Sequence, residues 1–146
     1  MVLSYFNLKN KISIVTGAGG LLGQEHCKAL SSAGCKVIAL DINYINLKII
    51  KKKINCDIHK CDITKKKYIL RVKKKILLKY QKIDILINNA AVDYPISKKN
   101  KKITFENFTL KQLNKEIEVG VSGALLMSQI FGTIMAKNNE GVIINV

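Results

Sequence analysis

Residues 11–23, KISIVTGAGGLLG, decide the fold of this 146-residue chain. They begin with a short β-branched run that predicts a buried strand, and residues 24–32 continue as a predicted helix. A glycine-rich turn between a strand and a helix leaves backbone N–H groups free at the helix N-terminus, where they can bind phosphate. The stretch therefore predicts a βαβ unit that binds a dinucleotide.

The glycines of this turn have separate predicted roles. Gly17, Gly20 and Gly23 follow a G-x-x-G-x-x-G spacing: the first permits a tight turn, the second lets the backbone approach a pyrophosphate, and the third lets helix and strand pack closely. Such spacings also arise by chance, so the inference depends on the flanking strand and helix. We expect the cofactor to lie against Gly17, Gly19, Gly20, Leu22 and Gly23.

A second predicted strand, residues 35–40, ends at an acid. Asp41 lies about 20 residues beyond the turn, where a carboxylate can accept hydrogen bonds from the adenosine ribose hydroxyls. No basic residue follows it directly, and its charge would repel a 2'-phosphate, so the sequence favours NAD over NADP. An alternative is that Asp41 is the N-cap of a helix beginning near Asn43, and the two roles are compatible.

The remaining pattern alternates helices and strands along the whole chain. This alternation predicts an α/β fold, a Rossmann-like doubly wound parallel sheet with helices on both faces, in a single domain of residues 1–146. The expected elements are a helix at 44–53, a strand at 56–61, a helix at 65–80, a strand at 83–87, a helix at 108–137 and a strand at 142–146.

The net charge of +15 raises the possibility of a nucleic-acid partner. Arg71 is the only arginine, however, although arginine suits bidentate phosphate and base contacts, and few aromatic residues interleave the lysines. We expect no nucleic-acid partner. The uncharged run 119–136 approaches the length of a membrane span, but it contains Ser122, Gln129 and Thr133, so a buried helix is expected and no membrane.

The cysteines and the first residues indicate a cytoplasmic protein. Residues 1–10 lack the long apolar segment of a secretory signal. The four cysteines form no C-x-x-C pair, so reduced thiols are expected. Cys56, His59 and Cys61 lie close together in the sequence, but on a strand Cys56 points to the opposite face from the other two, and no metal site is expected.

Four segments together resemble the short-chain dehydrogenase/reductase family over nearly the whole chain. They are the 16–23 turn, Asp41, Asp62-Ile63 and the Asn-Asn-Ala-Ala segment 88–91. The resemblance implies that Asp62 and Ile63 lie beside the adenine, and that Asn89 and Ala90 belong to a segment that steadies the sheet and lines the cofactor cleft. Alternatively, Asp62 caps a helix and the asparagines form a turn.

The sequence also departs from the family pattern. Leu21 stands where shorter members carry glycine, which resembles the extended members that modify sugar nucleotides, whereas Asn-Asn-Ala resembles the oxidoreductases. Gly120 stands where the family usually has an active-site asparagine, so the resemblance supports no proton-relay role at this position. This combination is similar to members associated with the modification of surface sugars, an analogy at the level of the family.

The family's catalytic serine and Tyr-x-x-x-Lys pair lie beyond the fifth strand, whereas the sequence given ends at Val146. We therefore expect a sheet truncated after strand five and assign no catalytic residue. Tyr-x-x-x-Lys occurs at 5–9, 44–48 and 94–98, but lysine is so abundant that these matches carry no assignment.

The prediction is the cofactor-binding part of an NAD-dependent oxidoreductase whose full-length parent acts on a small alcohol or carbonyl substrate. The alternatives are a non-catalytic dinucleotide-binding or regulatory module, a sugar-nucleotide-modifying member and, more weakly, a methyltransferase. We expect the 108–137 helix to be buried by more than one sheet face, and to form a homo-oligomer interface if the protein is complete. The strand at 142–146 should leave an uncovered apolar edge.

Overall fold

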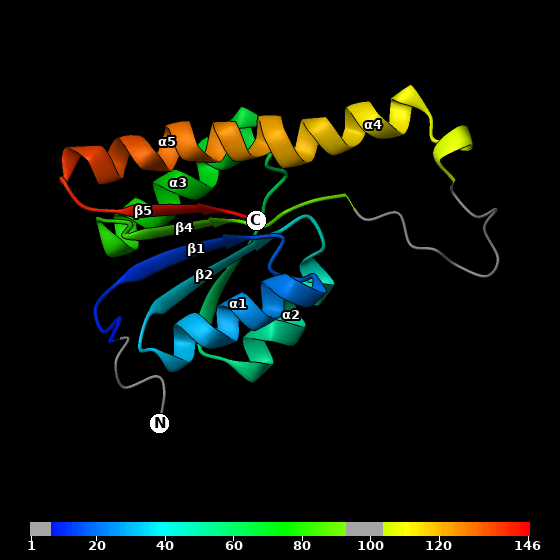
Figure 1. Ribbon diagram of the computed structural model, residues 1–146. Helices are drawn as coiled ribbons and strands as arrows, with labels where there is room; N and C mark the ends of the chain where they lie inside the picture. The colour runs from blue at the N-terminus through cyan, green and yellow to red at the C-terminus, as the bar shows by residue number, and fades with distance from the viewer. Residues whose placement is uncertain (1–6, 93–103) are drawn as a thin grey trace.

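Five parallel strands form one sheet in the computed structural model, which describes residues 7–92 and 104–146 (Figure 1). The strand order is β3-β2-β1-β4-β5, and every neighbouring pair is parallel. The order reverses between β1 and β4, which is where open α/β sheets bind ligands. The strands are β1 Ile12–Thr16, β2 Lys36–Asp41, β3 Cys56–Lys60, β4 Ile85–Asn88 and β5 Val142–Asn145.

Helices cover both faces of this sheet, as the sequence predicts. In Figure 1, α1 and α2 lie on one face, and α3 and the long α4–α5 helix lie on the other. The helical elements are α1 Leu21–Ser32, α2 Tyr44–Lys53, α3 Lys66–Tyr80, the 3₁₀ turn η2 Phe105–Asn107, α4 Leu110–Ile117, the π-helical segment η3 Glu118–Gly123 and α5 Ala124–Lys137.

Each face of the sheet has its own hydrophobic core. One core joins alternate strand residues such as Ile14 and Leu86 to α3 and α5, with Phe131 fully buried. The other joins Val15 and Val37 to α1 and α2. Apolar residues on both faces of β1 and β2 explain why these strands are nearly continuous hydrophobic runs.

Two helices begin two or more residues away from the predicted position, each because of its cap. The first begins at Leu21 rather than residue 24, since Gly20 already has extended N-cap geometry. The long helix begins at Leu110 rather than near 108, because Thr109 and Gln112 form a capping box. Its middle is π-helical from Glu118 to Gly123, a feature that the apolar pattern does not predict.

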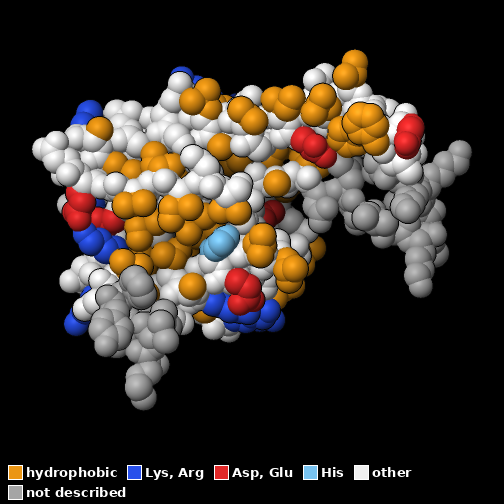
Figure 2. All heavy atoms as spheres, in the orientation of Figure 1, with side chains coloured by type: hydrophobic (Ala, Val, Ile, Leu, Met, Phe, Trp, Pro, Cys, Tyr) orange, Lys and Arg blue, Asp and Glu red, His pale blue; other side chains and the backbone are white. Residues whose placement is uncertain are grey.

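The long helix is not buried by more than one sheet face, so that expectation is wrong. Only one side of α5 packs on the sheet, through Met127, Phe131 and Met135. The part of the long helix from residue 110 to residue 125 exposes apolar side chains to solvent, at Leu110, Leu113, Ile117, Val121 and Leu125. Figure 2 shows hydrophobic side chains at the surface of this helix. By length and composition alone, residues 110–137 would be able to cross a membrane.

The β5 edge is apolar and uncovered in the described structure. Val142 is 54% exposed, Ile143 37% and Ile144 45%, whereas the neighbouring Leu86 is fully buried. The predicted uncovered strand edge is therefore present.

The four cysteines are free and buried, and Cys56 and Cys61 lie in different hydrophobic cores. Burial raises the pKa of Cys27 to about 12 and that of Cys61 to about 11, so both thiols are protonated near neutral pH. Cys56 belongs to the core beneath α1 and α2, whereas Cys61 belongs to the opposite core. Within the described residues no group of three metal-ligating side chains converges.

Candidate functional site

A hollow of about 360 Å³ lies at the carboxyl ends of the strands, between the glycine-rich turn and the segment after β4. This is the position at which the strand order reverses. Among the residues predicted to bind a cofactor, those that line this hollow are Gly17, Gly20, Asp41, Asp62, Ile63 and Ala90; Gly19, Leu22, Gly23 and Asn89 lie in the same segments but outside its lining.

The turn after β1 requires glycine at two positions for steric reasons. Gly17 has a φ of +63°, and a Cβ there would lie 2.8 Å from Cα of Ala90. A Cβ on Gly23 would lie 2.1 Å from the carbonyl oxygen of Gly17, because the start of α1 packs directly on the turn. The tight turn and the close packing that the spacing predicts are both present.

The N-terminus of α1 is suited to an anion. Gly20 provides no side-chain cap, and the first N–H groups of an α-helix have no intrahelical acceptor. These groups belong to Leu21, Leu22 and Gly23, and the helix dipole adds partial positive charge at the same place. Since Gly20 lines the hollow, a phosphate there would meet unpaired backbone donors.

Asp41 is held at the rim of the hollow by two backbone donors. One carboxylate oxygen accepts a hydrogen bond from the Gly19 N–H at 2.9 Å, and the other accepts one from the Asn43 N–H at 2.8 Å. The alternative that Asp41 is the N-cap of α2 is wrong. Asn43 is the cap, because its side-chain oxygen accepts from the N–H groups of Ile45 and Asn46.

Asp62 and Ile63 form the wall of the hollow after β3. One oxygen of Asp62 accepts hydrogen bonds from the N–H of Thr64 at 3.0 Å and from its hydroxyl at 2.7 Å. This is a local Asx-type turn and not the cap of α3, whose N-cap is Lys65. The alternative that Asp62 caps the helix is therefore wrong, and Ile63 is buried against Gly123.

The segment after β4 joins three elements and is more than a turn. The Thr16 hydroxyl oxygen accepts hydrogen bonds from the N–H groups of Asn89 and Ala90, at 3.0 and 3.1 Å. The Asn89 side chain donates to the Thr16 carbonyl at 3.1 Å. The Asn88 side chain donates to Asn145 on β5 at 2.9 Å and to Ser128 on α5 at 3.0 Å. These bonds hold the floor of the hollow in place.

Several residues at the site were not predicted from the sequence. Thr16, which carries the hydrogen bonds just described, could have been recognised as a hydroxyl residue at the end of β1. Ile42 directly follows Asp41 and lines the hollow. Lys115 and Val119 reach it from the long helix, and no local signal could reveal this, because the contact depends on how that helix crosses the sheet.

Gly120 and the Tyr44–Lys48 match lie outside the lining of this hollow. Gly120 lies in η3, and a Cβ there would meet no atom within 4 Å. Tyr44 and Lys48 lie on α2 and outside the lining of this hollow, with the Lys48 ammonium 5.3 Å from the centre of the Tyr44 ring. Tyr5 and the 94–98 match lie outside the described residues.

Comparisons with known proteins agree with this arrangement. Residues 11–146 match the family model described as short chain dehydrogenase. The chain is 34% identical over 143 residues to an NAD-dependent glycerol dehydrogenase of Listeria innocua, covering 96% of this chain and 53% of that protein. It is 32% identical over 145 residues to the post-translational flagellin modification protein A of Campylobacter coli, covering 94% of this chain and 55% of that protein. The chain thus spans about half the length of these relatives.

Solved structures share the fold. A putative D-mannonate oxidoreductase from Haemophilus influenza with bound NAD superposes with a TM-score of 0.80 at 25% identity, covering 92% of this chain and 54% of that one. A metagenomic short-chain oxidoreductase in complex with NADP also gives 0.80, at 21% identity, covering 94% of this chain and 62% of that one. Together with the strand order, these likenesses confirm the predicted Rossmann-like fold.

Proposed function

The chain belongs to the short-chain dehydrogenase family, and from this premise we propose that it binds NAD(H) for an oxidoreductase that transfers a hydride between the nicotinamide and an alcohol or carbonyl carbon. The observation that supports this best is the Asp41 carboxylate, fixed by two backbone N–H groups at the rim of the hollow after the glycine turn.

Each part of the hollow suits one part of the adenosine end of the cofactor. The free N–H groups at the start of α1 would hold the pyrophosphate. Asp41 would accept hydrogen bonds from the ribose hydroxyls, and Asp62 and Ile63 would lie against the adenine. Ala90 lines the hollow beside the turn, close enough to Gly17 that a Cβ on Gly17 would lie 2.8 Å from the Ala90 Cα. When bound, the nicotinamide would supply the hydride chemistry.

NAD is the proposed form of the cofactor. The Asp41 carboxylate would repel a 2'-phosphate on the ribose that it contacts. The residue that follows it and also lines the hollow is Ile42, which offers a phosphate no positive charge or donor side chain. Relatives whose names specify glycerol and D-threitol dehydrogenases support polyols as the first substrates to test with the whole protein.

The NAD preference can be tested by calorimetry with Asp41→Asn, which removes the charge and keeps the size of the side chain. We expect the wild type to bind NAD more tightly than NADP. In the variant, the ratio of the NADP to the NAD dissociation constant should fall by about tenfold, since 1.4 kcal/mol corresponds to a factor of ten. Asp57→Asn is the control, because it removes one negative charge outside this hollow. Equal affinities in wild type, or the same narrowing in the control, would contradict the role of Asp41.

We also propose that a second copy of this chain covers the outer side of the long helix. The support is a row of exposed apolar side chains at helical spacing, with Leu113, Ile117, Val121 and Leu125 on one side. Leu125→Lys should lower the mass measured by light scattering toward that of the monomer. Leu78→Lys, at a still more exposed apolar position on α3, should leave the mass unchanged. An unchanged mass for Leu125→Lys would contradict the proposed interface.

A further inference from the structure

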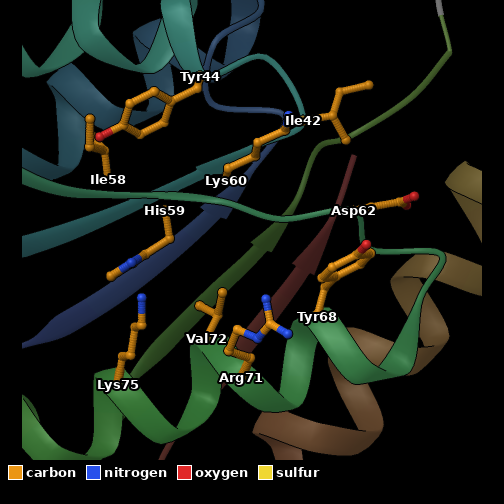
Figure 3. Close-up of a pocket in the computed structure, with 10 residues that line it drawn as sticks. All are labelled: Ile42, Tyr44, Ile58, His59, Lys60, Asp62, Tyr68, Arg71, Val72 and Lys75. Atoms are coloured by element: carbon orange, nitrogen blue, oxygen red, sulfur yellow. The ribbon is translucent and has the colours of Figure 1, made fainter.

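A larger hollow, of about 730 Å³, lies outside the proposed cofactor site, between the edge strand β3 and helix α3 (Figure 3). Tyr68, Arg71 and Lys75 line it from α3, where their spacing places them on one side of the helix. In Figure 3, His59 points from β3 toward Lys75, and Lys60 lies on the other side of β3 beside Tyr44.

The charges around this hollow are unbalanced. Within the described residues, none of Lys60, Arg71 and Lys75 forms an ion pair. The only acid in the lining is Asp62, whose carboxylate extends away from Arg71 and Lys75 in Figure 3. Burial and the neighbouring Lys75 and Lys79 ammonium groups lower the pKa of His59 despite the nearby Asp57 carboxylate.

The only arginine of the chain lies in this hollow. The chain has 25 lysine and arginine residues, so lysines are expected in almost any surface depression, but Arg71 is unique. Its guanidinium lies 5.8 Å from the Tyr68 ring centre, which restricts its orientation. A planar guanidinium held in this way can bind two oxygens of a phosphate at once.

The backbone of β3 adds further donors at the same place. The Cys61 N–H donates to the Asp41 carbonyl, so the alternation of a parallel strand directs the N–H groups of Ile58 and Lys60 toward the free edge. Ile58 and Lys60 both line the hollow. Cationic side chains and backbone donors thus meet at one open edge.

We propose that this hollow binds a small molecule with two or more adjacent phosphate groups, held by Arg71 and Lys75 with the β3 edge. A single phosphate would engage only some of these donors, whereas a polyphosphate chain can span from the α3 cations to the strand edge. The site is separate from the proposed cofactor hollow, which shares with it only Ile42 and Asp62.

Inorganic tripolyphosphate is the probe, titrated by calorimetry at low ionic strength because salt screens exposed charges. We expect saturable binding of one equivalent, with orthophosphate at least about tenfold weaker, and Arg71→Gln to weaken tripolyphosphate binding by about tenfold, which is the scale of one charge-assisted hydrogen bond. Lys74→Gln is the matched control, since Lys74 is exposed on the same helix but does not line the hollow. Circular dichroism confirms that both variants are folded.

A saturating amount of NAD should leave tripolyphosphate binding unchanged, which separates this site from the cofactor site. Displacement by NAD would overturn the proposal, because the probe would then occupy the cofactor hollow. An equal loss of affinity in Lys74→Gln and Arg71→Gln would also overturn the proposal, because it would show a diffuse attraction to the lysine-rich surface. The absence of saturable tripolyphosphate binding would overturn it as well. If NAD does not bind at all, the proposed function is contradicted. The titrations with tripolyphosphate still test the site proposed here, because they do not depend on NAD.

Discussion

Two irregular backbone segments come close to the proposed cofactor hollow, and they use glycine in different ways. In the turn after β1 and the start of α1, a Cβ on any of the glycines would meet another atom within 3.3 Å, and at Gly17, Gly20 and Gly23 that atom belongs to the backbone. In the π-helical segment η3, Gly123 is buried against Ile63, whereas a Cβ on Gly120 would meet nothing within 4 Å. The turn is fixed by contacts, while the π-helical segment is only partly fixed.

The difference shows that a glycine marks a structural constraint only where its φ is positive or where another part of the chain lies close to it. Gly17 and Gly23 are required by a positive φ or by the approach of another chain segment. Gly120 has neither reason within the described structure, so its presence carries the usual cost of glycine inside a helix. Alanine substitutions at Gly23, Gly123 and Gly120 test this difference through the free energy of unfolding.

Gly23→Ala should have the largest effect. Its Cβ would overlap the Gly17 carbonyl oxygen at 2.1 Å, so the turn and α1 must move apart, and we expect a loss of at least about 3 kcal/mol in the free energy of unfolding. Urea denaturation at low protein concentration measures this loss of stability. Because the same movement displaces the free N–H groups at the start of α1, NAD binding should also be lost. A variant as stable as wild type would show that the turn is not tightly packed.

Gly123→Ala should have an intermediate effect. The new methyl group would lie 2.7 Å from Cδ1 of Ile63, a buried side chain that can shift only partly. Overpacking of this kind costs about 1–3 kcal/mol, offset by roughly 1 kcal/mol from the better helix propensity of alanine. We expect a net loss of about 1 kcal/mol in urea denaturation, together with weaker NAD binding, since Ile63 lines the hollow. Ile63→Val in the same background should restore part of both losses.

The contrast between these segments also shows how far the sequence could predict the structure. The βαβ unit was predictable because its signals are local: a β-branched strand, spaced glycines and Asp41 within about 30 residues. The hydrogen bonds from Asn89 and Ala90 to Thr16 join residues more than 70 positions apart. The resemblance to a family implied that this segment lines the cleft, but no pattern showed the Thr16 hydroxyl as its acceptor.

The long helix was less predictable because its environment is not encoded locally. A nearly uncharged run indicates apolar contact but does not show which side is covered, so the outer row that includes Val121 and Leu125 was wrongly expected to be buried against the sheet. The π-helical segment has no distinctive composition. Caps are local signals, by contrast, and the capping box of Thr109 and Gln112 was visible in the sequence and not used.

Gly120→Ala should have the smallest effect, and its sign should be opposite. Glycine in a helix is about 0.5–1 kcal/mol less favourable than alanine, and no neighbour within 4 Å opposes a methyl group here. We therefore expect the variant to be more stable by several tenths of a kcal/mol in urea denaturation, with NAD affinity unchanged, since Gly120 does not line the hollow. Destabilisation would mean that something outside the described residues, such as a second copy of the chain, approaches Gly120. Repeating the measurement with Leu125→Lys, which should separate the copies, distinguishes that contact from an effect within one chain.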